Sequence, residues 1–236
     1  MKTDESMASH CSWRAGGPAR RLYRPADSAD LVAFLKQLPD EEPLLWVGLG
    51  SNLLVRDGGF PGTVVLTTGR LAELTFSDGE LRVEAGASCA KVARECARAG
   101  MGGLEFFAGI PGTVGGALAM NAGAFGGETW EHVLSVETVD RHGEVRVRTP
   151  GEFSVSYREV NGEPGEWFLA ARLRLQPGDS EAAQQRIRAL LERRAATQPT
   201  REPSCGSTFR NPPSDHAARL IEAAGLKGLC IGQACV

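Results

Sequence analysis

The segment from Ala108 to Gly127 constrains this chain more than any other part of the sequence. It reads AGIPGTVGGALAMNAGAFGG, and apolar residues such as Ile110, Val114 and Leu118 are interleaved with its glycines. An ordinary surface loop would not carry these apolar residues. Glycines allow the backbone to approach a ligand closely, so we expect this second glycine cluster to line a binding site. Amides of 113–116 would face a phosphate, and 123–127 would approach a flat ring system.

A first glycine cluster, GLGSNLLV at 48–55, follows a short apolar run at 44–47 that is typical of a buried strand. Its small residues leave consecutive backbone amides free to face an anion such as a diphosphate, and Ser51 and Asn52 add side-chain donors. The spacing is neither GxGxxG nor GxxxxGK[ST], so it indicates neither a Rossmann fold nor a P-loop. A tight turn between two strands is the alternative interpretation.

Composition excludes several classes of protein. The chain has 236 residues, of which 42% are hydrophobic and 23% charged, with 26 basic against 29 acidic side chains, so nucleic acid is not an expected partner. No apolar run reaches the ~20 residues that cross a membrane, and the first ten residues are polar and acidic, which favours a cytoplasmic protein without a membrane partner. We expect six free cysteines and no metal site, because no CxxC pair occurs and the four histidines are dispersed.

Periodicity and turn residues divide the chain into elements. Residues 1–10 are expected to form a mobile tail, and Pro177-Gly178-Asp179 suggests a domain boundary. The predicted helices lie at 28–38, 88–100, 180–197 and 214–224. The predicted strands lie at 44–47, 64–66, 81–85, 133–139, 144–149 and 167–175, and the chain ends in an apolar strand-like run, LCIGQACV.

Four motifs in order carry a resemblance to a known family. They are GLGSNLLVRD at 48–57, AGIPGTVGGALAMNAGAFG at 108–126, SYR at 156–158 and PSCGSTFRNP at 203–212. Together they resemble the UDP-N-acetylenolpyruvoylglucosamine reductases, in their shorter subtype without the tyrosine-bearing substrate loop. The resemblance extends over essentially the whole chain.

The resemblance implies an α+β protein with the two-part FAD-binding fold of the vanillyl-alcohol oxidase and p-cresol methylhydroxylase type. The FAD-binding domain would span 14–177, with subdomains of about 14–70 and 71–177, after an N-terminal tail at 1–13. Residues 178–236 would form a substrate-binding domain that is incomplete, because the family continues beyond the motif AAGLKGLCIGQACV.

The resemblance also implies a reaction, the NADPH-dependent reduction of UDP-N-acetylglucosamine enolpyruvate to UDP-N-acetylmuramate in peptidoglycan synthesis, carried out by a monomer with FAD. Arg14, Gly16 and Gly17 would lie near the entrance of the FAD domain. The cofactor-binding residues carried over from the family's motifs are Gly48, Gly50, Ser51, Asn52, Leu53, Gly109, Pro111, Gly112, Thr113, Gly115, Gly116, Asn121, Gly123 and Ala124.

Arg158 and Ser207 match the family's catalytic arginine and proton donor, and Tyr157, Arg210 and Asn211 match substrate-binding positions. A guanidinium suits a carboxylate that becomes enolate-like, and a hydroxyl beside glycine can approach a substrate carbon. Without the motifs, Arg158 could equally be a surface ion-pair residue, Ser207 a turn residue, and Asn211 part of a turn before the next helix.

The sequence departs from the family in one respect: no residue matches the glutamate near the family's C-terminus that completes the catalytic set. Two other hypotheses therefore stay open. The chain could be another flavin oxidase of the same fold, although the 203–212 motif argues against this, or an FAD-binding fragment without catalytic activity.

Overall fold

The computed structural model describes residues 1–198, 204 and 206–236. The chain divides into two compact units, Met1–Arg201 and Glu202–Val236, which we describe separately. The first unit contains both glycine clusters, and the second contains the 203–212 motif.

A four-stranded sheet opens the first unit. Its order is β1-β2-β4-β3, in which β2 and β3 both run parallel to β4, and β1 runs antiparallel to β2. The strands are β1 (Lys2–Ser6), β2 (Pro18–Tyr23), β3 (Leu44–Val47) and β4 (Phe60–Leu66). The β4 run Val64-Val65-Leu66 is fully buried, as expected of a strand with covered faces. Between β2 and β3 the chain forms α1 (Ser28–Leu35), capped by Asp27, whose side chain accepts from the Asp30 amide.

A five-stranded antiparallel sheet follows, with the order β11-β10-β14-β6-β5. Its strands are β5 (Leu74–Ser77), β6 (Glu80–Glu84), β10 (Val133–Asp140), β11 (Val145–Arg148) and β14 (Glu166–Arg174). Leu81 and Val83 of β6 and Ala171 and Leu173 of β14 face the largest hydrophobic core. This alternation of buried and exposed positions was the sequence signal for the strands.

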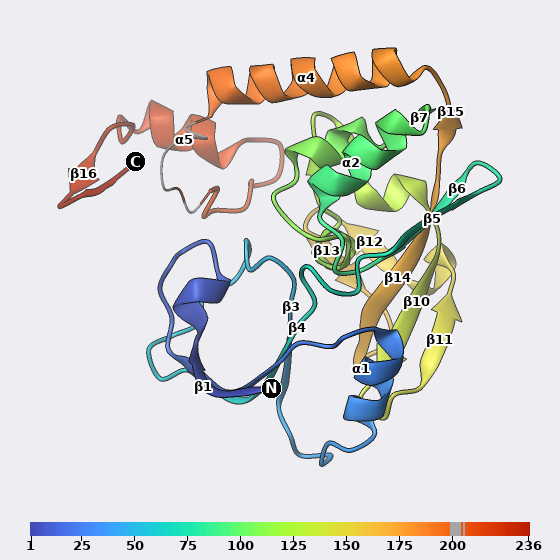
Figure 1. The fold of residues 1–236 in the computed structure, drawn as a ribbon. Helices are drawn as coiled ribbons and strands as arrows, with labels where there is room; N and C mark the ends of the chain where they lie inside the picture. Colours follow the sequence, from blue (N-terminus) through green and yellow to red (C-terminus); the bar gives the residue numbers. More distant parts are fainter. Residues whose placement is uncertain (199–203, 205) are drawn as a thin grey trace. The chain divides into compact units, whose positions relative to one another are not determined.

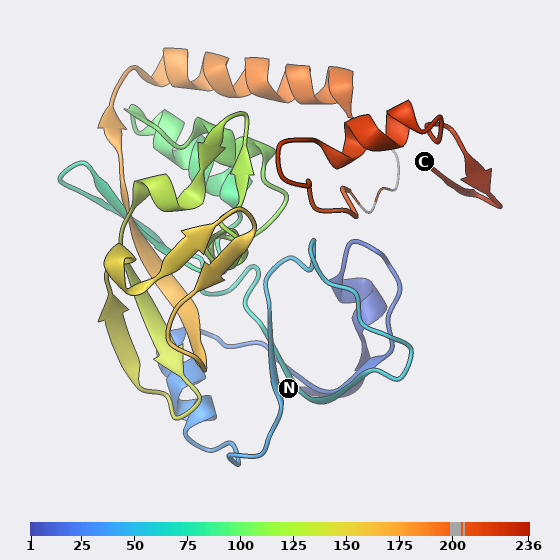
Figure 2. The same ribbon diagram turned by 180° about the vertical axis from the view of Figure 1, so that it is seen from behind.

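Helices cover the core side of this second sheet (Figures 1 and 2). The helices are α2 (Cys89–Arg98), α3 (Val114–Ala119) and α4 (Ser180–Thr197). Short strand pairs complete the unit: β7 (Met101–Gly102) with β15 (Gln176–Pro177), β8 (Gly123–Ala124) with β9 (Gly127–Glu128), and β12 (Ser154–Ser156) with β13 (Glu159–Asn161). The predicted helices and strands of this unit are confirmed, apart from shifts at their ends. The short α3, inside the second glycine cluster, was not predicted.

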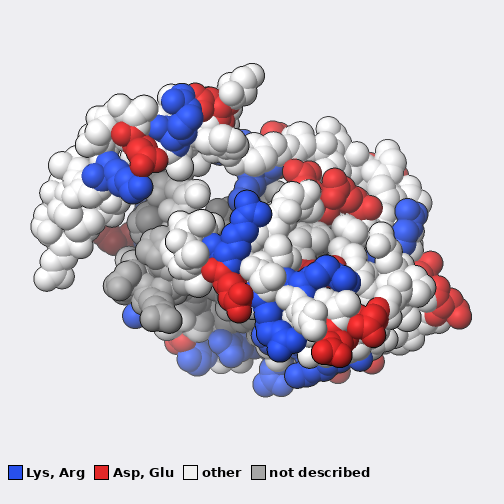
Figure 3. All heavy atoms as spheres, turned by 90° about the horizontal axis from the view of Figure 1, so that it is seen from above, with Lys and Arg blue, Asp and Glu red and all other residues white. Residues whose placement is uncertain are grey.

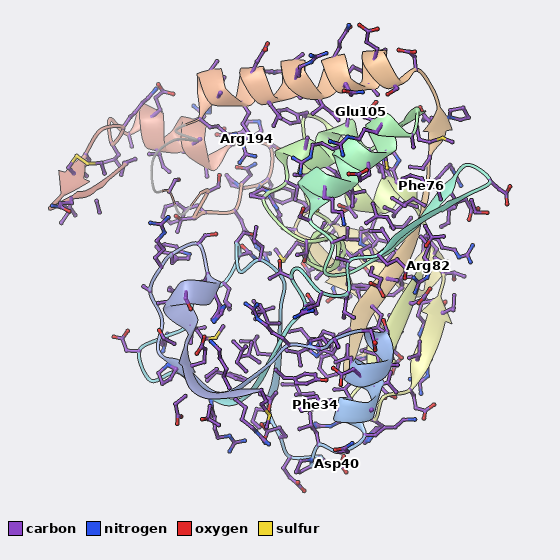
Figure 4. The ribbon with its side chains drawn as sticks, viewed as in Figure 1. Phe34, Asp40, Phe76, Arg82, Glu105 and Arg194 are labelled. Carbon is purple, nitrogen blue, oxygen red and sulfur yellow. A yellow bond between two sulfur atoms is a disulfide. The ribbon has the colours of Figure 1, made fainter. Side chains whose placement is uncertain are left out.

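Helix α1 joins the two sheets through a shared hydrophobic cluster. Leu31 and Leu35 of the helix pack with Val65 of the first sheet and with Val139 and Leu169 of the second. Phe34 stacks on the Tyr23 ring, with 3.7 Å between centroids, and the side chain is labelled in Figure 4. The two sheets are therefore held together by burial of apolar side chains.

The prediction of a mobile N-terminal tail was wrong. Residues 2–6 form β1, and residues Met7–His10 form a short 3-10 helix, η1. Met7 is 0% exposed and packs in the core of the first sheet, and its amide donates to the Gly17 carbonyl. No apolar pattern predicts β1, because it is a polar strand at the edge of the sheet and only one apolar residue follows it to be buried.

The division between the units falls later in the chain than the predicted boundary at 177. Helix α4 packs against α2 and the 3-10 helix η2 (Glu105–Gly109), and it buries Ala183 and Ile187 in the large core. Arg186 of α4 forms an ion pair of 2.7 Å with Glu105, which is labelled in Figure 4.

On the face viewed in Figure 3, basic and acidic side chains are interspersed.

The second unit contains α5 (Ala217–Ala223) and a hairpin of β16 (Cys230–Ile231) and β17 (Ala234–Cys235). A disulfide joins Cys230 to Cys235, so the expectation of free thiols was wrong for this pair. The hairpin register places the two cysteines opposite each other, which a search for CxxC spacing misses. Cys11, Cys89 and Cys96 are free, and Cys205 lies outside the described residues. Burial raises the pKa of Cys89 and Cys96 to about 12, which keeps both thiols protonated.

Among the helices that the structure describes, none has the length and apolar character needed to span a membrane.

Replacing Met7 with alanine tests the contribution of the N-terminal segment to the core. We expect Met7→Ala to lower the free energy of unfolding by about 2–5 kcal/mol, because it removes a fully buried side chain and leaves a cavity. Leu54→Ala is the control, since Leu54 is 58% exposed and its loss should cost less than about 0.5 kcal/mol. Urea unfolding followed by circular dichroism measures both. Equal stability of the two variants would contradict the packing described here.

Candidate functional site

The two glycine clusters lie against each other although they are far apart in the sequence. A β-carbon on Gly48 would collide with the side chain of Thr113, so the backbones approach at a distance that only glycine allows. Nearby, Asn52 Nδ2 lies 3.6 Å from the Met120 sulfur. The structure thus brings together the two segments that the sequence analysis singled out.

The backbone amides of the two clusters differ in their hydrogen bonding. In the second cluster, the Val114 and Gly115 amides donate to carbonyls of the loop before α2, and the Gly116 amide donates to Thr113 Oγ1. The expectation that the amides of residues 113–116 face a phosphate was therefore wrong for these three. In the first cluster, the hydrogen bonds of the described residues include none donated by the amides of residues 49–53 to a protein acceptor. The first cluster is consequently the one equipped to bind an anion.

The N-terminal segment packs against the first cluster and determines its backbone shape. Gly50 has φ +72°, and a β-carbon there would collide with the carbonyl of His10 in η1. The Ser12 amide donates to the Gly50 carbonyl at 3.1 Å. The shape of the first cluster thus depends on residues that the sequence analysis had placed in a mobile tail.

A cavity of about 480 Å³ opens where the clusters meet the two sheets. Gly48 and Thr67 line one side, Gly115 and Gly116 of α3 another, and residues 160–164 after β12 a third. Trp46 and Trp167 also line it, and their rings stack with centroids 5.1 Å apart and planes inclined by 15°. Among the described residues, Trp46 Nε1 is the one buried side-chain nitrogen or oxygen without a hydrogen-bond partner. A buried unpaired donor beside a cavity indicates a site for a polar ligand.

Glu166 at the start of β14 brings a buried carboxylate to the same cavity. It accepts hydrogen bonds from Arg148 Nη2 at 2.6 Å and from Thr138 Oγ1 at 2.6 Å. The Arg148 guanidinium, helped by the Thr138 hydroxyl, holds the pKa of Glu166 below its ordinary value. The carboxylate is therefore ionised and fixed in place at neutral pH.

Arg158 occupies a strained turn. Ser156 of β12 pairs with Glu159 of β13, so Tyr157 and Arg158 form a two-residue turn. Arg158 has φ +58°, a conformation that favours glycine and that is enriched among non-glycine residues at functional sites. Its guanidinium carbon lies 6.0 Å from the centre of the exposed Tyr157 ring. The predicted catalytic arginine is thus presented on a hairpin tip next to its predicted neighbour.

Helix α4 reaches the second glycine cluster through Arg194. Its Nη1 donates to the Gly109 carbonyl at 2.8 Å, and Figure 4 shows the side chain extending from the helix. A β-carbon on Gly109 would collide with the Phe125 ring, so this glycine is also needed for packing. Gly123 and Ala124 form β8, which pairs with β9 and closes the cluster into a small hairpin.

The other predicted site residues lie in the second unit. Ser207 is exposed and follows Gly206, whose φ is +72°, and Arg210 is also exposed. The Asn211 side-chain oxygen accepts from the Ala217 amide at 3.1 Å, where α5 begins. This supports the alternative that Asn211 shapes the turn before the helix.

Sequence reasoning missed three residues that line the cavity: Trp46, Trp167 and Glu166. They stand on β3 and β14, strands that the sequence did predict, and a large or charged side chain on a predicted buried strand was the available signal. It also missed Glu128, which accepts a hydrogen bond from Asn121 at 2.8 Å. In the described part of the chain, no group of three or more His, Cys, Asp or Glu side chains is arranged to hold a metal ion.

Comparisons with known proteins agree with this geometry. Residues 19–148 match the family model of an FAD binding domain, and residues 198–236 match that of the UDP-N-acetylenolpyruvoylglucosamine reductase C-terminal domain. A UDP-N-acetylenolpyruvoylglucosamine reductase from Alkalilimnicola ehrlichii is 65% identical over 230 residues, which cover 98% of this chain and 77% of the relative.

Solved structures give the same result. The UDP-N-acetylenolpyruvylglucosamine reductase of Thermus caldophilus superposes with a TM-score of 0.84 at 34% identity, covering 98% of this chain and 82% of that one. A cholesterol oxidase from Brevibacterium sterolicum, at 14% identity, covers 71% of this chain and 36% of its own, with a TM-score of 0.55. The second likeness concerns the fold alone. The predicted two-part FAD-binding fold is confirmed.

Alanine at Gly48 tests the contact between the clusters. We expect Gly48→Ala to lower the melting temperature and to disturb the cavity, because the new methyl group would collide with Thr113. Gly58→Ala is the control, since no atom lies within 4 Å of a β-carbon at that position. Thermal unfolding measures both variants. A Gly48→Ala protein as stable as Gly58→Ala would show that the clusters do not pack as described.

Glutamine at Glu166 tests the buried carboxylate. We expect Glu166→Gln to lower the free energy of unfolding at pH 7 by about 1–3 kcal/mol, the range for losing hydrogen bonds to a charged group. Because the folded-state pKa of Glu166 is lowered, its contribution is present above about pH 4.3 and disappears as the pH falls through that lowered pKa.

The difference between Glu166→Gln and the unchanged protein should therefore shrink in acid, as denaturant unfolding at pH 7 and at pH 3 would reveal. Glu163→Gln is the matched control, because Glu163 lines the same cavity but is exposed. A deficit for Glu166→Gln that stays constant with pH would contradict the role of the charge.

Proposed function

Because the chain belongs to the family of UDP-N-acetylenolpyruvoylglucosamine reductases, FAD-dependent oxidoreductases of peptidoglycan synthesis, we propose that it reduces UDP-N-acetylglucosamine enolpyruvate to UDP-N-acetylmuramate with NADPH. The observation that supports this most directly is the cavity beside the two glycine clusters, because both clusters lie within residues 19–148, which match an FAD binding domain. NADPH as the electron donor belongs to the proposal.

The cavity, together with the first glycine cluster whose Gly48 lines it, fits FAD. The unpaired amides of the first cluster suit a diphosphate, and the stacked pair Trp46–Trp167, with its unpaired Nε1, suits a planar nucleotide base. Glycines whose β-carbons would collide with neighbouring atoms keep the backbones close. We propose that the cofactor is held by Gly48, Gly50, Ser51, Asn52, Leu53, Gly109, Pro111, Gly112, Thr113, Gly115, Gly116, Gly123 and Ala124.

Reduction of the enolpyruvyl double bond adds a hydride to one carbon and a proton to the other. When bound and reduced by NADPH, the flavin would supply the hydride. We propose that Arg158 binds the substrate carboxylate and stabilises the negative charge that develops beside it, with Tyr157 holding the guanidinium on one side. The strained turn supports this role, since an arginine gains no stability from a left-handed conformation.

We propose that the Ser207 hydroxyl donates the proton to the other carbon. Ser207 is exposed, and the flanking Gly206 leaves space for a substrate to approach the hydroxyl. Arg210 and Asn211 would bind the substrate nucleotide from the same segment. NADPH and UDP-sugars are kept in the cytoplasm, so we place the reaction there. We assign the reaction to a monomer. We propose that its product contributes to cell-wall growth, cell shape and cell division.

The test is a turnover assay with the purified, flavin-loaded chain. We expect NADPH oxidation that depends on UDP-N-acetylglucosamine enolpyruvate, followed at the NADPH absorbance band. If the chain binds flavin but its NADPH oxidation does not respond to this substrate, the proposed reaction is refuted and an FAD-binding fragment without catalytic activity is favoured.

Ser207→Ala separates the two half-reactions. We expect flavin reduction by NADPH to keep its rate, and flavin reoxidation by substrate to slow by about 10²–10⁴-fold, because only the second half-reaction needs the proton. Stopped-flow flavin absorbance follows both steps. Ser204→Ala is the control from the same segment, since the Ser204 hydroxyl oxygen accepts from the Gly206 amide. Equal slowing of both half-reactions would refute the role of Ser207.

A further inference from the structure

Asn121 was expected to bind the cofactor, but its side chain is fully engaged within the protein. It is 5% exposed. Its Oδ1 accepts from the Trp130 amide at 3.2 Å, and its Nδ2 donates to Glu128 Oε2 at 2.8 Å and toward the Ser156 carbonyl at 3.5 Å. A primary amide has two N–H donors, and both are directed at protein acceptors.

The backbone of Asn121 explains why an asparagine stands there. Its φ is +39°, in the left-handed region that asparagine tolerates better than most residues. The residue lies after α3, where the second glycine cluster turns toward β8. Glu128, its partner, ends β9 and begins the 3-10 helix η3 (Thr129–His132). The Asn121–Glu128 bond thus spans the base of the small β8–β9 hairpin.

The contact with Ser156 connects this hairpin to another. Ser156 ends β12, and its carbonyl immediately precedes the turn formed by Tyr157 and Arg158. The same two segments meet a second time, because the Trp130 ring packs on Phe153 with centroids 4.7 Å apart. The turn that carries Arg158 is therefore fixed to the second glycine cluster by aromatic packing and by the Asn121 amide.

We propose that Asn121 and Glu128 are positioning residues: their hydrogen bond fixes the Asn121 amide, and the same amide, directed at the Ser156 carbonyl, holds the β12–β13 hairpin against the second glycine cluster and so orients Arg158. The Asn121 side chain then contacts no part of the cofactor. The inference rests on the proposed function only where it assigns Arg158 a task at the substrate.

A reversal of the hydrogen bond tests the pair. Asn121→Asp places two carboxylates against each other, and we expect it to lower the melting temperature and to weaken FAD binding by about tenfold. In Asn121→Asp/Glu128→Gln, the glutamine amide can donate to the aspartate, so FAD affinity and melting temperature should both return to near their original values. Flavin fluorescence during titration of the cofactor-free protein gives the affinity.

A matched control carries the same change of charge at the wrong partner. Glu131 accepts from the Glu128 amide at 3.1 Å and does not contact Asn121 in the described hydrogen bonds. Asn121→Asp/Glu131→Gln should stay as weak as the single variant. If adding Glu128→Gln to Asn121→Asp restores the melting temperature but not the FAD affinity, the side chain at position 121 contacts the cofactor directly and the proposal fails.

A second readout isolates the effect on Arg158. Neither aspartate at 121 nor glutamine at 128 restores the donor to the Ser156 carbonyl, so the reversed pair should still reoxidise its flavin with substrate about three- to tenfold more slowly, at saturating FAD. In an Arg158→Lys background the reversed pair should cause no additional slowing, because residues that act through one another are not additive.

Full recovery of the reoxidation rate, or independent losses in the Arg158→Lys background, would overturn the link to Arg158. Failure of the proposed function is distinguishable from these results. If the protein bound no FAD at all, the melting temperatures of the cofactor-free variants would still report whether the Asn121–Glu128 bond forms.

Discussion

The site depends on the close approach of Gly48 to Thr113. This contact brings the loop after β3 of the first sheet against a short helix that covers the antiparallel sheet, and it tolerates no side chain at 48. The cavity opens beside this contact. The amides of residues 49–53 donate to no protein acceptor among the described hydrogen bonds, whereas those of Val114 and Gly115 donate to the loop before α2. The first cluster therefore has free amides that can bind an anion, whereas the second is held in place by close packing and by its own hydrogen bonds.

Much of the fold could be predicted, because it is recorded in local patterns. Alternation in β6 and β14 and the capped apolar stripe of α2 specify their elements without help from distant residues. The position of β1 could not be predicted in this way, because its stability comes from pairing with β2 and from the burial of Met7. The disulfide of the second unit depends likewise on hairpin register.

The same distinction between local patterns and contacts with distant residues applies to the candidate site. The glycine pattern identified both clusters and the motif identified Arg158. The sequence also predicted anion-facing amides in both clusters and a cofactor contact for Asn121, where the structure shows bonded amides in the second cluster and an Asn121 side chain engaged within the protein. Those properties depend on partners from other elements, such as Ala85, Ala87 and Glu128. The roles proposed for Ser207 and Arg210 rest on the motif, and the structure places both at the surface of the second unit. Sequence patterns thus locate the segments, whereas packing decides what each group can do.

The order of strands has a consequence for how the protein folds. In the first sheet β4, the last of its strands to be synthesised, lies between β2 and β3, and in the second sheet β14, also the last, lies between β10 and β6. Neither sheet can be completed until its final strand has left the ribosome. The earlier strands must wait with unpaired edges, and such non-local pairing is slow. During synthesis, β6 can therefore pair only with β5, and β10 only with β11, until residue 174 emerges.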